Sequence, residues 1–336
     1  MNPINGIFPL LTAEKSIIII PHKNPDADAI GSTLALFNFF KKIGLNATVV
    51  SPNLFPKFLN WLPNADKIII AENNIDSTSE IIKKADIIFC LDFNTLSRID
   101  ILENCVKEST AIKVLIDHHQ EPSEFDFLYS DTEIPATSQL VYHFIELMDK
   151  EDLIDKEIAT CIYAGIISDT GSFRFSSVKP STHKIVAKLL KKGISHSSIH
   201  DNLYDNNTID KLKLLARTID LMDELKEFRT CIIHLNKDDL LKFNYQKGDT
   251  EGFVNYGLML ENCVFSVALF EDLHKNLVKI SFRSKGNFDV NAFARKHFDG
   301  GGHINAAGGI SKENMVDTIQ KLKNILVNYK SLLLEV

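Results

Sequence analysis

The chain of 336 residues lacks the features of a secreted or membrane-inserted protein. No aliphatic run exceeds the four isoleucines Ile17–Ile20, whereas a bilayer-spanning helix needs about 20 apolar residues. The N-terminus has no basic segment, and Glu14 and Lys15 interrupt its apolar stretch, so no secretory signal is expected. Five scattered cysteines without a Cys-x-x-Cys pair indicate reduced thiols rather than a disulfide framework. We therefore expect a cytoplasmic protein with no membrane partner.

Charge and composition exclude further classes. The formal net charge of -7 disfavours a general surface for duplex DNA. Hydrophobic residues make up 45% of the chain and charged residues 24%, which is ordinary for a globular protein and excludes a disordered or fibrous one. The length is about twice that of a typical domain, so the sequence predicts two domains.

The first half of the sequence predicts an α/β domain with a doubly wound, mainly parallel sheet. Short apolar runs predict strands at 16–21, 47–51, 67–71, 86–91 and 112–117. Longer amphipathic stretches between and after them predict helices at 29–42, 79–84, 95–107, 137–148 and 156–167. Continuous apolar strands separated by helices are typical of a parallel sheet covered on both faces. Thr137 or Ser138 is the expected cap of the helix at 137–148.

The second half predicts a smaller α+β domain. The composition becomes polar from Ser195 to about residue 207, and a helical segment at 208–227 is expected to connect the domains. Strands are then predicted at 230–235, 263–271 and 277–283, and helices at 290–297 and 312–326. The predicted division is 1–195 for the first domain, 196–227 for a linker with a helix, and 228–336 for the second domain. Phe173 and Phe175 alternate with polar residues, as in a short strand.

Acidic and histidine residues gather where predicted elements end. The carboxyl ends of parallel strands face one crevice of a doubly wound sheet, so most of these side chains should converge. Five carboxylates in one crevice would repel one another, and some would take up protons. The residues, which follow three strands and the helix at 156–167, are His22, Asp26, Asp28, Asp92, Asp117, His118, His119 and Asp169.

Divalent cations resolve this conflict of charge. Carboxylate and imidazole ligands suit Mn²⁺, Mg²⁺ or a similar metal. The candidate ligands outnumber those that one ion needs, so two ions sharing a bridging carboxylate is the simplest arrangement, and such pairs lie about 3.5–4 Å apart. A single aspartate at a strand end is usually a turn former or helix cap. The occurrence of the whole set, in order, at successive strand ends favours the metal interpretation.

The set resembles the four motifs of the DHH phosphoesterase superfamily: His22-x-x-x-Asp26-x-Asp28, Asp92, Asp117-His118-His119 and Asp169. A glycine-rich run near the C-terminus is similar to the signature of the DHH-associated domain; it reads Gly300-Gly301-Gly302-His303-x-Asn305. The resemblance extends over most of the chain. Length and domain order are most similar to the stand-alone NrnA-like subgroup, whose members are oligoribonucleases and pAp phosphatases.

The resemblance implies roles for these residues. One metal ion would be held by His22, Asp26 and Asp92, and a second by Asp28, Asp92, His118 and Asp169. Asp117 would orient its neighbours, and His119 would face the phosphate, stabilising the transition state or protonating the leaving oxygen. The resemblance favours Mn²⁺ and leaves Mg²⁺ and Co²⁺ open. It makes 1–195 the catalytic domain and 228–336 the substrate-binding domain, with the active site in the cleft between them.

The glycine run predicts contacts to a substrate. Successive glycines let backbone amides approach an anion closely, and His303 and Asn305 add side-chain donors. Arg283, followed by Ser284 at the end of a predicted strand, is a natural contact for phosphate or base. The roles of Lys285 and of the basic segment 295–297 stay open. The expected substrate-binding residues are Arg283, Ser284, Gly300, Gly301, Gly302, His303 and Asn305.

The predicted function is metal-dependent hydrolysis of phosphate esters. The expected substrates are short oligoribonucleotides, linear dinucleotides such as pGpG or pApA, and pAp, with no duplex DNA bound. Relatives are often dimers, so a homodimer is compatible with the resemblance. An exopolyphosphatase and a soluble cyclic-di-AMP phosphodiesterase are the alternatives. A nucleotide-binding regulator without turnover is a third, which the complete ligand set disfavours.

Overall fold

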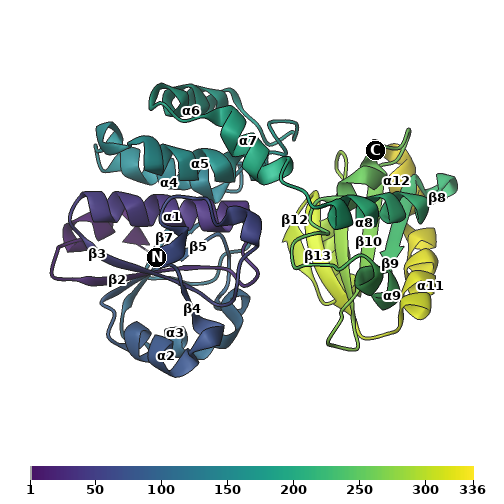
Figure 1. Cartoon of the computed structure of the whole chain (residues 1–336), viewed down its shortest axis with the longest axis horizontal. Helices are drawn as coiled ribbons and strands as arrows, with labels where there is room; N and C mark the ends of the chain where they lie inside the picture. Colours follow the sequence, from purple (N-terminus) through teal and green to yellow (C-terminus); the bar gives the residue numbers. More distant parts are fainter. Residues whose placement is uncertain (1) are drawn as a thin grey trace. The chain divides into compact units, whose positions relative to one another are not determined.

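The computed structural model describes residues 2–336, which divide into two compact units. The first unit extends to Asn206, and the second runs from Asn207 to Val336 (Figure 1). Each unit packs its own hydrophobic residues on both sides of one sheet. No helix within residues 2–336 combines the length and apolar character needed to cross a bilayer.

The N-terminal unit is built on a seven-stranded sheet in the order β1-β7-β6-β5-β2-β3-β4, and every pairing is parallel. Its isoleucine run explains the two-sided burial, because Ile17 and Ile19 enter one core while Ile18 and Ile20 enter the other. The strands are β1 Asn2–Pro3, β2 Ser16–Pro21, β3 Asn46–Ser51, β4 Ile69–Ile70, β5 Ile87–Leu91, β6 Ile112–Asp117 and β7 Phe127–Ser130.

Helices cover both faces of this sheet (Figure 1). One face carries α1 Ala27–Lys42, α4 Thr137–Leu147 and α5 Lys156–Asp169. The opposite face carries α2 Ile75–Lys83 and α3 Glu103–Glu108. Two further helices pack against α5, namely α6 Pro180–Lys191 and α7 His196–Tyr204. This arrangement confirms the predicted α/β class with a mainly parallel sheet.

The sheet reverses its direction of winding between β2 and β5. These two strands are neighbours, although β3 and β4 lie between them in the sequence and on the other side of β2. In open α/β sheets such a reversal leaves a crevice at the carboxyl ends of the two strands, where ligands bind. The residues that follow β2 and β5 are therefore placed at the natural binding edge of the sheet.

The C-terminal unit has a smaller mixed sheet in the order β12-β13-β11-β10-β9-β8, with only β9 and β10 parallel. Helices α10, α11 and α12 contribute to the core on one face, and α8 and α9 to the core on the other. The strands are β8 Asp223–Leu225, β9 Thr230–Leu235, β10 Phe265–Glu271, β11 Val278–Ser284, β12 Gly301–His303 and β13 Ala306–Ser311. The helices are α8 Ile209–Asp220, α9 Lys237–Lys242, α10 Val290–His297, α11 Met315–Leu326 and α12 Lys330–Glu335.

The predicted helix at 208–227 is wrong in its second half. Helix α8 ends at Asp220, and 223–225 form the edge strand β8, which pairs with β9. The turn between β8 and β9 ends at Arg229, whose φ is 47°. The pairing of β8 with β9 overrides the local helical spacing. The polar segment after Ser195 forms a further helix, α7. The Ser195 side chain accepts a hydrogen bond from the Ser198 amide and starts α7.

Three other predicted elements are shorter or different. The strand expected at 67–71 is limited to β4. The helix expected at 95–107 is broken at Asp100, whose φ of 48° separates a 3-10 segment from α3. The strand expected around Phe173 is a tight turn, because Gly171, Ser172 and Phe173 all have positive φ. In the last two cases backbone angles that no periodicity reveals decided the local structure.

Candidate metal centre

Three adjacent strands bring the first candidate residues to one edge. His22 follows β2, Asp92 follows β5, and Asp117 ends β6 with His118 and His119 directly after it. Because β2, β5 and β6 are neighbours in the sheet, their ends are neighbours too. His22, Asp92, Asp117 and His118 are all buried.

The start of α1 adds two carboxylates. The Asp26 Oδ1 atom accepts hydrogen bonds from the amides of Asp28 and Ala29, each at 3.0 Å, and so caps the helix. The other oxygen, Oδ2, lies 3.9 Å from His22 Nε2. Asp28, in the first turn, is fully buried.

The start of α4 holds the buried Asp28 carboxylate in place. The amides of Thr137 and Ser138 donate to its two oxygens at 2.6 and 2.9 Å. The Thr137 hydroxyl donates to Asp92 Oδ1 at 2.9 Å. The predicted capping of α4 by Thr137 or Ser138 is therefore wrong, because the N-cap residue is Ala136 and the capping carboxylate comes from α1. The positive end of the helix dipole favours a carboxylate at this position.

Asp169 reaches the centre because α5 crosses α1 very closely. A Cβ atom on Gly31 of α1 would lie 2.7 Å from the Cys161 carbonyl oxygen of α5, and one on Gly165 would collide with the Ser138 side chain. Sequence reasoning missed both glycines, although a glycine inside a helical pattern is a signal of close backbone approach. The crossing brings Asp169 Oδ2 to 3.3 Å from His118 Nε2.

His22 and His118 are oriented in the same way. His22 Nδ1 lies 2.8 Å from the Lys23 carbonyl oxygen, and His118 Nδ1 lies 3.1 Å from that of Ile134. Donation from Nδ1 to a carbonyl puts the lone pair on Nε2, which is how many metal-binding imidazoles are held. In both residues Nε2 faces Asp92, with His22 3.6 Å from Oδ2 and His118 3.5 Å from Oδ1.

Among residues 2–206, potential ligand atoms form three sets whose atoms all lie within 4.8 Å of one another. The sets within this unit are His22, Asp26 and Asp92; Asp28, His118 and Asp169; and Asp92, Asp117 and His119. Asp92 turns one oxygen toward His22 and the other toward His118. A carboxylate in this position is able to bridge two cations. The structure thus brings together all of the residues that the sequence predicts as ligands.

The electrostatics indicate a shortage of positive charge. Burial, with the charges of Asp92 and Asp169, raises the pKa of Asp28 well above its usual range. Burial likewise raises the pKa of Asp169. Burial also acts to raise the pKa of Asp92, but the hydrogen bond from His118 and the surrounding imidazoles outweigh it and lower that pKa. Asp117 Oδ2 is buried with no hydrogen-bond partner within residues 2–336. Oxygen and imidazole donors with excess negative charge fit hard divalent cations.

His119 is placed differently from the other histidines. Its Nδ1 lies 2.7 Å from Asp117 Oδ1 and 3.9 Å from Asp92 Oδ1. Asp117 is fully buried, whereas the His119 side chain is 13% exposed. The buried carboxylate thus holds a partly accessible imidazole at the edge of the cluster, which suits a group that acts on a substrate.

In the C-terminal unit, Arg283 and His303 lie in one row of the sheet. Arg283 of β11 is paired with Ala306 of β13, which is paired in turn with His303 of β12. Directly opposed residues of antiparallel strands face the same side. The alternate residues Phe282 and Ala307 enter the core beneath α10 and α11, so Arg283 and His303 lie on the other face with a small alanine between them. The Arg283 guanidinium and the His303 imidazole thus lie on the two sides of the Ala306 methyl group on this face.

Three other predicted substrate contacts are already bonded inside the unit. The Ser284 hydroxyl donates to the Phe288 carbonyl at 2.6 Å and accepts from Asn305 Nδ2 at 2.8 Å. The Gly302 amide, which was expected to face an anion, donates to Asn291 Oδ1 at 2.9 Å in this structure. Gly300 is required for a different reason, because a Cβ atom there would collide with the Gly308 carbonyl oxygen. These residues hold the hairpin of β12 and β13 in shape.

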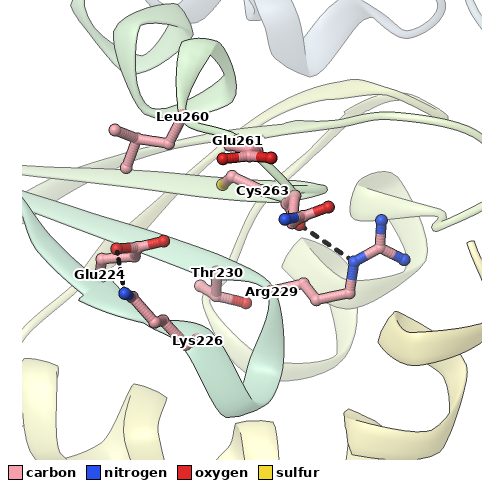
Figure 2. Close-up of a pocket in the computed structure, with 8 residues that line it drawn as sticks. Glu224, Lys226, Arg229, Thr230, Leu260, Glu261 and Cys263 are labelled. Atoms are coloured by element: carbon pink, nitrogen blue, oxygen red, sulfur yellow. Dashed lines mark hydrogen bonds and ion pairs between the residues drawn. The ribbon is translucent and has the colours of Figure 1, made fainter.

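A pocket in the C-terminal unit contains none of the predicted site residues (Figure 2). In it the Arg229 Nε atom donates to the Asn262 carbonyl at 3.0 Å, and Lys226 faces Glu224 at 3.8 Å. With Glu261 also present, its charges disfavour a phosphate ligand. The lining residues are Glu224, Lys226, Arg229, Thr230, Leu260, Glu261, Asn262 and Cys263.

Comparisons with known proteins agree with this geometry. The family model described as "DHH family, N-terminal domain" matches residues 16–166, and the DHHA1 domain model matches residues 233–328. The chain is 30% identical over 304 residues to the bifunctional oligoribonuclease and PAP phosphatase NrnA of Thermus thermophilus, covering 90% of this chain and 86% of that protein. It is 27% identical over 295 residues to the Bacillus subtilis protein of the same name, covering 87% and 88%.

A solved structure is similar throughout. The crystal structure of an exopolyphosphatase-related protein from Bacteroides fragilis is 38% identical, with a TM-score of 0.92, and the match covers 98% of this chain and 97% of that one. The agreement of motifs, fold and relatives establishes the family. The chain belongs to the DHH family and carries a C-terminal DHHA1 domain.

Proposed function

We propose that this chain is a metal-dependent phosphoesterase that hydrolyses short oligoribonucleotides and linear dinucleotides to mononucleotides, and pAp to AMP. One observation carries the proposal above all others: Asp92 faces His22 with one oxygen and His118 with the other, inside a buried cluster of carboxylates. The names of the Thermus thermophilus and Bacillus subtilis relatives support the substrate class.

The two oxygens of Asp92 face different histidines, and we assign one metal ion to each. His22, Asp26 and Asp92 would hold one divalent ion, and Asp28, Asp92, His118 and Asp169 the other, with Mn²⁺ the ion we favour. Two such ions lower the pKa of a bound water and polarise phosphoryl oxygens. The amides of Thr137 and Ser138 keep Asp28 in place, and the Thr137 hydroxyl does the same for Asp92.

His119 is the residue that we assign to the substrate. Its Nδ1 is held by Asp117, so its Nε2 is the atom that would donate a hydrogen bond to the phosphate or a proton to the leaving oxygen. The buried Asp117 would fix the orientation of the imidazole. Asp117 thus acts through His119 rather than on the phosphate.

The C-terminal unit would bind the rest of the nucleotide. Arg283 and His303 share one face of the sheet and would contact the phosphate or the base, while Ser284, Asn305 and the glycines 300–302 shape the hairpin beside them. In this proposal 1–195 is the catalytic part and 228–336 the substrate-binding part. Of the linker expected at 196–227, α7 packs with the first unit, and α8 and β8 belong to the second.

An exopolyphosphatase is the second candidate function. The similar Bacteroides fragilis structure is described as exopolyphosphatase-related, and a two-ion centre serves a phosphoanhydride as well as an ester. Arg283 and His303 would bind phosphate in a nucleotide as well as in polyphosphate. The two activities therefore differ in whether the substrate must contain a nucleoside.

Turnover of pAp, pApA, a short RNA, cyclic-di-AMP and polyphosphate, each with Mn²⁺ or with a chelator, tests the proposal. We expect manganese-dependent release of mononucleotide or phosphate from the first three, and its loss in Asp92→Asn. Asp86→Asn is the matched control, because Asp86 precedes the same strand and pairs with Lys15. Turnover of polyphosphate alone would establish the second candidate. Tight nucleotide binding with no turnover would instead indicate a regulator.

A further inference from the structure

All 22 phenylalanines lie within residues 2–336, and Phe175 is the one among them that is exposed. Its side chain is 40% exposed. Singly exposed apolar residues are common and by themselves indicate nothing. Phe175 differs because of where it lies and how its loop is built.

The loop that carries Phe175 begins at a candidate metal ligand. Asp169 ends α5, and Gly171, Ser172 and Phe173 follow with φ values of 54°, 57° and 66°. Two successive non-glycine residues in this region are strained, and such strain persists only where surrounding contacts enforce it. Strained segments cluster at ligand-binding and catalytic sites.

Hydrogen bonds hold the loop in this shape. The Ser172 amide donates to the Ile167 carbonyl at 2.8 Å, and the Phe173 amide donates to the Thr170 hydroxyl at 3.0 Å. The Arg174 and Phe175 amides both donate to the Thr170 carbonyl, at 2.9 and 3.1 Å. The loop is therefore ordered before any ligand arrives.

Phe173 and Phe175, which the strained turn carries, have different surroundings. Phe173 packs inward against Tyr163 and His183, with ring centroids 6.3 and 5.3 Å away. Phe175 instead lies over Gly171, where a Cβ atom would be 2.6 Å from its ring. The Gly171 Cα lies at most about 7.6 Å from that of Asp169, since two peptide links separate them. The exposed ring is thus anchored beside the metal centre.

Arg174 brings a positive charge to the same loop. Its Nε atom donates to the Gly171 carbonyl at 2.9 Å, and the side chain is on the exposed surface. An aromatic face next to an arginine is the combination by which proteins bind unpaired nucleotides, with the base on the ring and the phosphate near the cation.

We propose that Phe175 is a stacking platform for a nucleobase of the substrate, with Arg174 beside it for that nucleotide's phosphate. The proposal rests on the proposed function, because it places the base of a nucleotide whose phosphate is at the metal centre. The ligand class is a purine or pyrimidine ring in a single-stranded nucleotide. Stacking accepts any base, which suits an enzyme that degrades RNA fragments of mixed sequence.

Kinetics on a substrate with and without its base test the platform. We compare pAp with the same ribose bisphosphate lacking adenine, using the wild type, Phe175→Leu and Phe175→Trp. Phe175→Leu should raise KM for pAp about tenfold with kcat nearly unchanged, and leave the base-free substrate unaffected. Phe175→Trp should restore the KM for pAp. Leu147→Ala, which changes another exposed apolar residue at the end of α4, is the control and should leave the KM for both substrates unchanged.

Two results would overturn the platform while leaving the enzyme intact. One is an unchanged KM for pAp in Phe175→Leu; the other is an equal loss on both substrates, which would mean that the variant disturbs the metal centre. Failure of the proposed function looks different, because the wild type itself would then turn over neither bisphosphate.

Discussion

Gly31 on α1 and Gly165 on α5 meet at the crossing of these two helices. A Cβ atom on Gly31 would lie 3.1 Å from the Gly165 amide nitrogen and 2.7 Å from the Cys161 carbonyl oxygen. The missing side chains let the helix backbones approach each other closely. That approach places Asp169, at the end of α5, against the residues that follow the strands.

Gly31→Ala should therefore destabilise the N-terminal unit. The new methyl group meets backbone atoms, which cannot rotate away, so we expect a loss of about 1–3 kcal/mol in the free energy of unfolding. Urea denaturation measures it. Gly308→Ala is the control, because the nearest atom to its Cβ would be 3.7 Å away. Equal stability of the two variants would show that the crossing has room to relax.

Divalent metal should stabilise the folded chain. Binding to the folded state alone adds about 2.7 kcal/mol at a metal concentration one hundred times Kd. Thermal melts with Mn²⁺ and with chelator measure this gain, which Asp92→Asn should largely abolish and Asp86→Asn should keep. If Mn²⁺ left the melting temperature of the wild type unchanged, this would contradict the two-ion assignment.

The metal-free protein should lose stability as the pH rises. Folding raises the pKa of Asp28 and Asp169 mainly through burial, and it raises that of His118 because hydrogen bonds and charge from Asp169 and Asp92 outweigh burial. Groups with raised pKa values bind more protons in the folded state, so their contribution falls as pH increases above their usual values of 3.8 and 6.5. Denaturation in chelator at pH 5 and pH 8 measures the slope. Saturating Mn²⁺ should flatten it, and a rise in stability between these pH values without metal would refute the argument.

His119→Gln should reduce kcat without removing metal. Loss of a general acid or phosphate contact lowers the rate by about 10²- to 10⁴-fold, while the predicted ligands are untouched. Asp117→Asn should cause a smaller loss, because Asp117 acts by holding His119. His143→Gln, a histidine paired with Glu146 on α4, should behave as wild type. A parallel loss of bound manganese in His119→Gln would make His119 a ligand instead.

Asp272→Asn should weaken the C-terminal unit at neutral pH. Although burial opposes it, the hydrogen bond from Lys279 and those from the His274 and Lys275 amides lower the pKa of Asp272 to about 2. Because this pKa is depressed, the contribution is present above the ordinary value of 3.8 and is lost as pH falls toward 2. We expect about 1–2 kcal/mol at pH 7. Denaturation at pH 7 and pH 3.5 compares Asp272→Asn with wild type, and Asp201→Asn is the exposed control. If the loss in the free energy of unfolding of Asp272→Asn were as large at pH 3.5 as at pH 7, the ion pair with Lys279 would not be its source.

Periodicity predicted the long elements of this chain well. Strands β2 and β9 and helix α10 have the predicted bounds, since apolar runs and amphipathic spacing report burial directly. Predictions failed where pairing or backbone angles decided the outcome. Strand β8 exists because β9 offers it a partner, and the turn after Asp169 exists because three residues accept positive φ.

The sequence by itself determined which residues could form the candidate site. Ligand types at successive strand ends, together with parallel-sheet topology, are enough to predict that His22, Asp92 and His118 converge, because strand order and direction fix where strand ends lie. Only the tertiary structure decided how that site is held. The capping of Asp28 by α4, the two-sided orientation of Asp92 and the outward ring of Phe175 depend on contacts between distant segments. Such contacts are set by packing in three dimensions, which leaves no local pattern in the sequence.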